Sequence, residues 1–433
     1  MSLTPEQARA LWDAGGFALI QGLPRGSEVG MDGTYHVANV FSGTKFVPPG
    51  LHMMVWAPSP KTAPAHNPTE GAKIEEIPEG QTDAGPGIPD AAALPLRAAY
   101  VHVWEPKERI GLQFDPASEN TSAPRTNIPE GELRELDPQL APYPFAGLNG
   151  WKSLTTCISK AVVEKAIPGG KVDAMSQVKG EAFDAKDKDA AAQEFLASTQ
   201  ASAGAPELHL SVFDLRRSWP EGSEAGDVSR WSVDKSKLWE RLAGEAGGKL
   251  PSAAGELTTG PRALLGQLQL SFLLLTNVWC YAALAPYKRL LAVMCRSKLA
   301  IAQPERFPSG QANDNVSFWG SFAADKQARE CVLELIRTLA AQLTSLPETA
   351  FDTELPSVDT FLQSEIEQLR QNVSAALAEP GWWGLAQRVA REWQGLQQAG
   401  ARFGWDIEAL GSGDDDEDEE GEYAPQVVEM TED

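Results

Sequence analysis

Histidine and acidic side chains are the residues of this chain whose types could support acid–base or metal chemistry. The five histidines are scattered and none forms an HxxxH or HxH pair, so we expect satisfied structural histidines rather than ligands. The chain has no GxSxG, GxxxxGK[ST] or GxGxxG motif. The sequence therefore predicts a protein that is not an enzyme, with no cofactor and no metal. The histidines are His36, His52, His66, His102 and His209.

Asp32-Gly33-Thr34 holds the residue types of an aspartic protease motif in the wrong order, and the chain has no second copy. Those proteases need two carboxylates that share one proton. Asp and Gly tolerate the positive φ angles of a hairpin turn, so a turn is favoured here. We expect Asp32 to cap or brace that turn.

The C-terminal tail joins an acidic run to a short apolar peptide. Residues 414–420 are all Asp or Glu and follow Gly411 closely. Like charges repel one another, so we expect residues 406–433 to form an acidic, disordered tail. The peptide after the run carries aromatic and β-branched residues and is expected to add a strand to the sheet edge of a partner.

Four residues of this peptide are the expected contacts. Tyr423 and Val427 would share one face of the added strand and Val428 the other, because side chains alternate along a strand. Pro425 cannot donate a ladder hydrogen bond, so pairing should begin after it. The sequence thus predicts a binding protein before any domain is considered.

The formal net charge is −23, from 37 basic and 60 acidic residues. Eleven of the acidic residues and none of the basic ones lie from Gly411 onward, which leaves −12 on the remainder. An acidic surface repels phosphate backbones, so no direct nucleic-acid binding is expected. A basic or mixed-charge protein partner is favoured.

The four cysteines include no CxxC pair, which indicates a reducing compartment without a disulfide framework. The first residues lack the basic and apolar regions of a signal peptide. The apolar stretch 264–284 contains Gln267 and Gln269, so a buried core helix is favoured over a membrane span. The cysteines are Cys157, Cys280, Cys295 and Cys331.

Residues 1–166 are expected to form an antiparallel β-rich domain, a sandwich or a small barrel. After a short helix at 5–12, apolar runs of strand length alternate with Gly and Pro turns. The Pro-, Gly- and Ala-rich residues 57–95 interrupt this pattern as an exposed insertion. Helical spacing from Trp151 to Val162 predicts a helix that closes the domain.

The second half is expected to be helical, which makes the chain an α+β multidomain protein. Residues 167–206 are predicted to be a linker, and 207–405 a mainly helical domain. Pro286 is expected to separate two apolar helices, because proline interrupts a helix interior. The expected helices are 236–242, 261–285, 286–302, 324–343, 358–377 and 383–398.

Two passages resemble the AAR-two family, the a-one cistron splicing factors. One runs from Gly22 to Asp32 and continues in Phe41-Ser42-Gly43 and the 47–52 segment; the other is 264–272 with 287–291. The closing peptide looks like the tail of fungal members. Gln267, Tyr287 and Ala99 depart from the family's usual Glu, Trp and Gly, and the family pattern does not explain the insertions 57–95, 168–206 and 302–325.

The matching motif residues are expected to specify the fold, with direct contact to a partner left open. The Pro-Arg-Gly and Pro-Pro-Gly tripeptides have the composition of tight turns. The residues carried over are Pro24, Arg25, Gly26, Asp32, Pro48, Pro49, Gly50, Gly266, Lys288 and Arg289.

The resemblance implies an assembly chaperone of the U5 small nuclear ribonucleoprotein (snRNP). Members bind the PRP-eight scaffold at its RNase H-like and Jab/MPN-like domains and keep the Brr-two helicase from docking. Phosphorylation-linked release lets the particle mature. The family fold is a β-rich domain followed by a VHS-like helical domain. Cytoplasm and nucleus, no membrane and a monomeric free state are the corresponding expectations.

Two alternatives stay open at this point. One is a hydrolase with an unrecognised site, which would need a pocket of carboxylates with perturbed pKa values. The other is a generic acidic chaperone that binds any basic protein through its tail.

Overall fold

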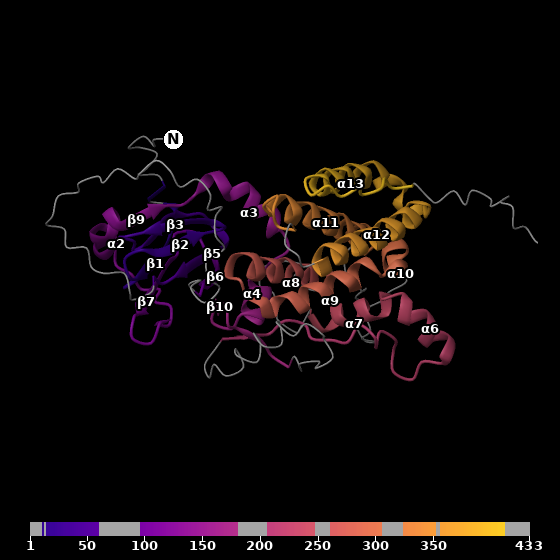
Figure 1. The fold of residues 1–433 in the computed structure, drawn as a ribbon, viewed down its shortest axis with the longest axis horizontal. Helices are drawn as coiled ribbons and strands as arrows, with labels where there is room; N and C mark the ends of the chain where they lie inside the picture. The colour runs from indigo at the N-terminus through magenta and orange to yellow at the C-terminus, as the bar shows by residue number, and fades with distance from the viewer. Residues whose placement is uncertain are drawn as a thin grey trace, which may run out of the picture. The chain divides into compact units, whose positions relative to one another are not determined.

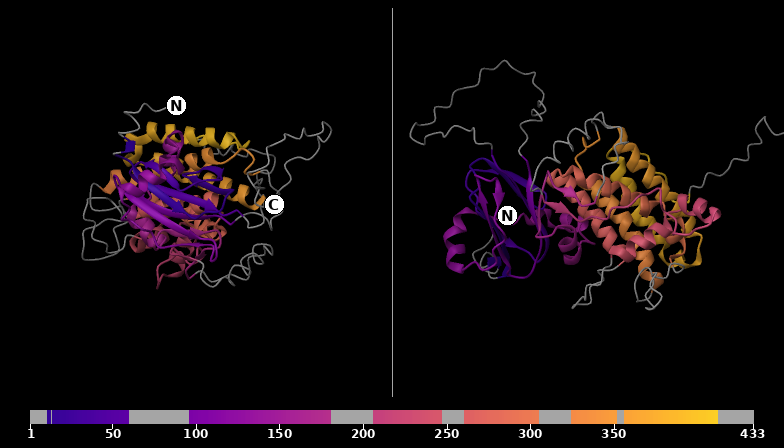
Figure 2. Two further views of the ribbon diagram at one scale, coloured as in Figure 1. Left: turned by 90° about the vertical axis from the view of Figure 1, so that its left-hand side faces the viewer. Right: turned by 90° about the horizontal axis from the view of Figure 1, so that it is seen from below.

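The computed structural model describes residues 11–12, 14–59, 96–180, 206–246, 260–304, 324–351 and 356–411 (Figure 1). The chain divides into two compact units that interleave along the sequence. Unit 1 comprises residues up to Trp151, Val163–His209 and Leu273–Ala282, and unit 2 the remainder. The β-rich N-terminal and helical C-terminal halves are confirmed; Figure 2 shows the strands in indigo to magenta and most helices in red to yellow.

Unit 1 is a sandwich of two five-stranded sheets. The first has the strand order β8-β7-β1-β4-β9, in which β1–β7 and β4–β9 are parallel. The expectation of antiparallel pairing therefore fails for these two pairs, whose members are not successive along the chain: β2 to β6 lie between β1 and β7, and all of these but β4 belong to the other sheet. The strands are β1 Gly16–Gln21, β4 Gly43–Val47, β7 Arg109–Asp115, β8 Asn120–Thr121 and β9 Leu140–Pro142.

The second sheet is antiparallel throughout and has the order β10-β6-β5-β2-β3. Strand β3 forms one edge of this sheet, and β10 the other. The strands are β2 Ser27–Met31, β3 Thr34–Ala38, β5 Gly50–Ala57, β6 Ala98–Trp104 and β10 Lys171–Asp173.

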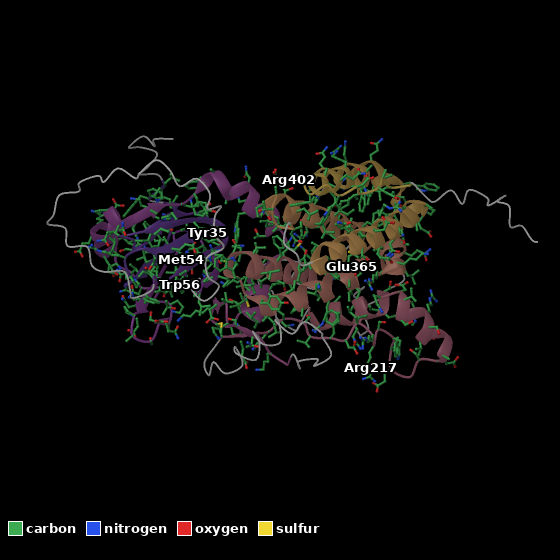
Figure 3. All side chains as sticks on the ribbon, viewed as in Figure 1. Tyr35, Met54, Trp56, Arg217, Glu365 and Arg402 are labelled. Atoms are coloured by element: carbon green, nitrogen blue, oxygen red, sulfur yellow. The ribbon has the colours of Figure 1, made fainter. Side chains whose placement is uncertain are left out.

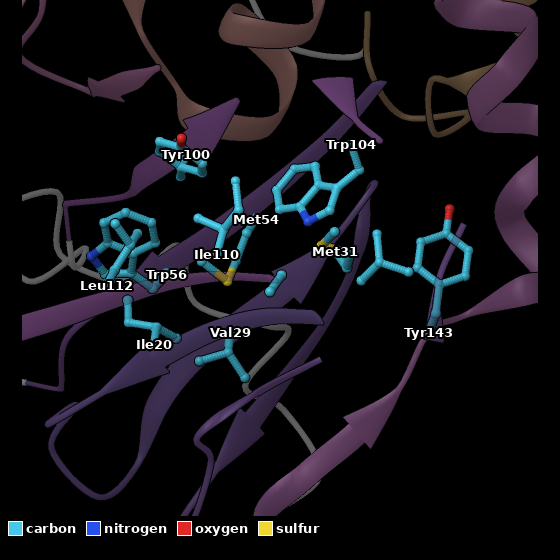
Figure 4. Close-up of a cluster of buried hydrophobic side chains, with 12 residues drawn as sticks. Ile20, Val29, Met31, Met54, Trp56, Tyr100, Trp104, Ile110, Leu112 and Tyr143 are labelled. Atoms are coloured by element: carbon cyan, nitrogen blue, oxygen red, sulfur yellow. The ribbon is translucent and has the colours of Figure 1, made fainter. Parts of the chain in front are cut away.

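Side chains from both sheets meet in one apolar core (Figure 4). Ile20 and Ile110 come from the first sheet, and Met54, Trp56 and Trp104 from the second. In β5 the residues of the other face, such as Met53 and Val55, are equally buried. A strand buried on both faces has a continuous apolar run rather than an alternating one, as Met53 to Trp56 shows.

The prediction of a linker at 167–206 is wrong in its first part. Strand β10 pairs with β6, and β11 (Gln177–Val178) pairs with β12 (Glu207–Leu208). Strands of two or three residues are too short to show an alternating pattern, so the sequence carries no signal for them. The remainder, 181–205, lies outside the described residues, as do the insertion 60–95 and the expected helix start before residue 11.

Unit 2 consists mainly of helices, of which α11 packs along α13, and α12 along α9 and α10. Helix α6 (Ala225–Val233) was not predicted, whereas α11 and α12 begin and end within two residues of expectation. None of the described helices is long and apolar enough to cross a membrane. The others are α7 Ser236–Ala246, α8 Pro261–Leu273, α9 Leu284–Cys295, α10 Lys298–Ala302, α11 Ala324–Ser345, α12 Pro356–Leu377 and α13 Ala386–Ala401.

The break between the two apolar helices lies elsewhere than predicted. Helix α8 ends at Leu273 and continues as a π-helical turn, η4 (Leu274–Val278), which closes at Trp279. Pro286 lies in the first turn of α9, where a missing N–H costs little. The helix expected to close the first domain is likewise two short ones, α3 (Leu148–Leu154) and α4 (Lys160–Ala166).

Candidate functional site

Asp32 occupies the two-residue turn that joins β2 to β3. Both Asp32 (φ 53°) and Gly33 (φ 82°) have the left-handed conformation, which suits a tight hairpin. The side chain of Asp32 is directed inward and is buried. The turn thus places a carboxylate inside unit 1.

Three groups lie within hydrogen-bond distance of the Asp32 carboxylate. The Met53 N–H donates to Oδ1 at 2.8 Å, and the Tyr143 hydroxyl donates to Oδ2 at 2.6 Å. The His52 Nδ1 atom lies 2.5 Å from Oδ2. Burial, and then the negative charge of Asp32, raise the pKa of Tyr143 above its ordinary value. The carboxylate therefore joins the hairpin, β5 and the residue that follows β9.

The second nitrogen of His52 faces the main chain. Its Nε2 atom lies 2.8 Å from the carbonyl oxygen of Pro48, and this oxygen can only accept a hydrogen bond. Serine hydrolases pair an Asp–His dyad with a hydroxyl at this nitrogen, whereas His52 meets a carbonyl there. Among the described residues the dyad therefore has a carbonyl where those enzymes have the nucleophile, and it brings together Asp32 and Pro48 of the family motif.

The remaining motif residues of unit 1 form turns. The Pro24 carbonyl accepts two hydrogen bonds from Ser27, one from the hydroxyl at 2.7 Å and one from the main-chain N–H at 3.3 Å. Gly26 has a φ of 79° and Gly50, at the start of β5, a φ of 131°. The side chains of Arg25 and Pro49 are exposed. Arg25 is the charged motif residue that unit 1 presents to solvent.

A second cluster surrounds Arg97, which the sequence did not single out. Its guanidinium donates to both carboxylate oxygens of Glu28, at 3.0 and 2.8 Å, and to the Asn277 carbonyl at 3.0 Å. It also lies close to two rings, 4.3 Å from the Tyr35 centroid and 3.8 Å from that of Trp279. Arg97 is buried, and the Tyr35 hydroxyl donates to Asn277 Oδ1 at 2.5 Å. The cluster attaches Leu273–Ala282 to the sheet.

Trp279 ends the π-helical turn in a conformation that is uncommon for a bulky side chain. Its φ is 60°, and its N–H donates to the Leu274 carbonyl. The side chain is 40% exposed although its ring contacts Arg97. π-Helical turns occur frequently at functional sites, so this exposed ring is a candidate contact.

The edge strand β3 contributes Tyr35 to this cluster. Thr34 and Met31 flank the two-residue turn as a hydrogen-bonded pair, so alternate residues of β3 bond to β2. The main-chain groups of Tyr35 and Val37 consequently point away from the sheet. Val37 is 72% exposed. Such an edge is able to pair with an added strand.

In unit 2 the motif residues of α8 pack against the turn between α3 and α4. A Cβ atom on Gly266 would lie 2.3 Å from the Cys157 carbonyl oxygen, so the backbones touch. Buried Gln269 accepts from the Cys157 N–H at 2.8 Å and donates to Thr156 and Thr338, both at 2.9 Å. Burial raises the pKa of the Cys157 thiol to about 11. This part of the motif is structural.

The other motif residues of unit 2 lie on α9. The Lys288 ammonium lies 5.1 Å from the Phe361 ring centroid, and Arg289 follows it on α9. No group of three metal-ligating side chains exists among the residues that the structure describes. The predicted strand residues lie outside that part of the chain. They are Tyr423, Pro425, Val427 and Val428.

Comparison with known proteins gives matches over nearly the whole chain. Residues 14–168 match the AAR2 N-terminal domain, and residues 210–408 the AAR2 C-terminal repeat region. The human and mouse proteins named "Protein AAR2 homolog" are each 28% identical over 451 residues, covering 100% of this chain and 98% of the relative. The Caenorhabditis elegans homolog is 26% identical over 173 residues, 39% of each chain.

Proposed function

Because the chain belongs to the AAR2 family, we propose that it is a non-enzymatic assembly factor of the U5 snRNP. Family membership supports a role in pre-mRNA splicing with a protein partner in the spliceosome. The observation that carries the proposal is the succession of both family domains in order along one chain. The motif residues lie at the turns and backbone contacts that shape both units.

The finer proposal names the partner and the consequence of binding. The protein binds the C-terminal RNase H-like and Jab/MPN-like domains of the PRP-eight scaffold and keeps the Brr-two helicase from docking. Phosphorylation-linked release then allows the particle to mature, and the protein works as a monomer in cytoplasm and nucleus. The exposed Trp279 and the free edge of β3 are surfaces of unit 1 that suit such a partner.

The hydrolase alternative has little support among the described residues. The Asp32–His52 pair is the arrangement closest to a catalytic one, and its outer nitrogen is bound to the Pro48 carbonyl. Removing the His52 ring should therefore change stability and leave any hydrolytic background untouched. A substrate-specific activity lost in His52→Ala, in protein that remains folded, would revive this alternative.

A pull-down from cell extract tests the proposed function. We expect to recover the scaffold and U5 proteins without the helicase. If the tail adds a strand to the partner, cutting the chain after Gly411 should weaken binding to the two scaffold domains. The variant Arg25→Glu tests whether the exposed motif residue of unit 1 contributes to the same binding. Recovery of unrelated basic proteins in equal amounts would favour the generic acidic chaperone.

A further inference from the structure

The exposed face of α13 is unusual in a chain of net charge −23. Five exposed residues of this face are spaced four, three, four and four positions apart, so they form one stripe along the helix. They carry no carboxylate. We call them, with the residue in the preceding turn, the α13 stripe. It consists of Trp383, Gln387, Arg391, Gln394, Gln398 and Arg402.

The stripe carries uncompensated positive charge. Arg388 and Glu392 of α13 point toward α11 and form ion pairs with Glu330 and Arg337, both 2.8 Å long. Arg391 has no ion pair within the described ranges. Arg402 donates to main-chain carbonyls at the end of α11, such as that of Thr344 at 2.7 Å. Neither of these two arginines of the stripe meets a carboxylate in the part of the chain that the structure describes.

The stripe also has an aromatic anchor. Trp383 is 67% exposed, while its neighbour Trp382 is fully buried. Tryptophan and arginine are the side chains most enriched where binding energy concentrates. An exposed indole on the same stripe as two guanidinium groups that meet no described carboxylate therefore suits contact with an acidic segment.

The described chain ends beside this helix. After α13 it reverses: Gln397 donates to the Ile407 carbonyl at 2.8 Å and Trp393 to the Glu408 carbonyl at 2.9 Å. The N–H of Gly411 then donates to the Ser374 hydroxyl of α12 at 3.2 Å. The acidic run 414–420 begins three residues later. All of these residues belong to unit 2.

We propose that, in the free protein, the acidic run 414–420 binds in cis to the α13 stripe. Helix α13 is about 24 Å long, at roughly 1.5 Å per residue. Ten extended residues after Gly411 span up to about 33 Å, so the run reaches any point of the stripe. Surface ion pairs are weak, but a short tether raises the effective concentration to the order of millimolar. The contact is therefore reversible and sensitive to salt.

The cis contact has a consequence for the peptide beyond the run. Tyr423 to Met430 lies a few residues past the acidic run and is held near unit 2 while the run is bound. A partner with a competing basic surface releases it. The inference concerns the free protein alone, so it stands or fails independently of the proposed function.

Limited proteolysis of the full chain tests the contact. Chymotrypsin should cleave after Tyr423, the one aromatic residue beyond Gly411, and mass spectrometry measures the rate. We expect Arg391→Glu and Trp383→Ala to raise this rate at least about fivefold, and 0.5 M NaCl to do the same for the unchanged chain. Arg217→Glu is the matched control, because Arg217 is exposed and labelled well away from Arg402 in Figure 3.

Equal rates in the unchanged chain, in both stripe variants and at high salt would overturn the proposal. A second measurement adds a peptide of residues 412–433 to protein that ends at Gly411. Binding should weaken at least about tenfold in Arg391→Glu and stay unchanged in Arg217→Glu. Equal weakening by both charge reversals would show a non-specific attraction and would also overturn it.

Discussion

The guanidinium of Arg97 lies 3.8 Å from the ring centroid of Trp279, although 182 residues separate them in the chain. The guanidinium also lies 4.3 Å from the Tyr35 ring centroid, and its edge meets the Glu28 carboxylate. An arginine can stack and form a forked ion pair at once because its charge is planar. One side chain thereby holds together three separate segments of unit 1.

Arg97→Ala should lower the free energy of unfolding of unit 1 by about 3 kcal/mol, because it leaves Glu28 without its partner in a largely buried site. Arg97→Lys should recover only part of this loss, since an ammonium lacks the fork. Denaturant unfolding followed by tryptophan fluorescence measures both. Arg134→Ala, which breaks an exposed pair with Glu130, is the control and should cost less than about 1 kcal/mol.

Gly266→Ala should destabilise unit 2 severely, by more than about 2 kcal/mol, because the new methyl group meets the Cys157 carbonyl. Gly395→Ala in α13 is the matched control. A Cβ atom there has nothing within 4 Å, so this change should stabilise the helix by roughly 0.5–1 kcal/mol. Thermal unfolding of the two variants gives the comparison. Equal effects would contradict the close approach of α8 to this turn.

Asp32→Asn should cost about 2–3 kcal/mol, because a neutral amide replaces a buried carboxylate that lies within hydrogen-bond distance of the Met53 N–H, the Tyr143 hydroxyl and His52. Asparagine tolerates the left-handed conformation as well as aspartate does, so the change tests the charge and not the turn. Asp32→Ala should cost more, since it adds backbone strain. A near-zero effect of Asp32→Asn on the unfolding midpoint would contradict this account.

Stability should depend on pH through Glu365, whose carboxylate is completely buried against Arg296. Burial raises the pKa of Glu365 above its usual 4.5, although the hydrogen bond from Arg296 opposes the change. A carboxyl group with a raised pKa binds its proton more tightly in the folded protein. Its contribution is therefore fully present below pH 4.5 and is lost as the pH rises through the folded pKa.

The corresponding measurement compares the unchanged chain with Glu365→Gln between pH 4 and pH 7.5. Relative to the variant, the unchanged chain should gain stability as the pH falls. Glu367, two residues farther along α12, gives the opposite sign, because the hydrogen bond from Arg370 lowers its pKa. For Glu367→Gln the unchanged chain should lose its relative stability toward acid pH, by a small amount because Glu367 is 40% exposed.

Local chemistry made some elements predictable. The Asp32-Gly33 turn follows from two residue types that tolerate positive φ, and α11 and α12 follow from apolar spacing over 22 residues each. The helix break at Trp279 could not be predicted, because a tryptophan in the left-handed conformation has no sequence signal. The prediction that Pro286 separates the two apolar helices was wrong, since a proline is tolerated in the first turn of a helix.

The candidate site was less predictable than the fold. Arg97 forms hydrogen bonds with Glu28, which is 69 residues away in the sequence, and with Asn277, which is 180 residues away. No local sequence pattern predicts such pairings. The turn at Asp32 was predicted, but the hydrogen bond that its carboxylate accepts from Tyr143 was not, because 111 residues separate the two in the sequence. The predicted tail contacts lie outside the described residues, so they stay predictions.

The interleaving of the two units limits how this protein can be recombined. A crossover between two relatives anywhere from Leu210 to Phe272 would join the sheet of one parent to the Leu273–Ala282 segment of the other. Arg97 and Tyr35 would then have to accept a foreign Asn277 and Trp279. These positions should therefore be inherited together, and chimeras should succeed only when the ten-residue segment travels with the N-terminal half.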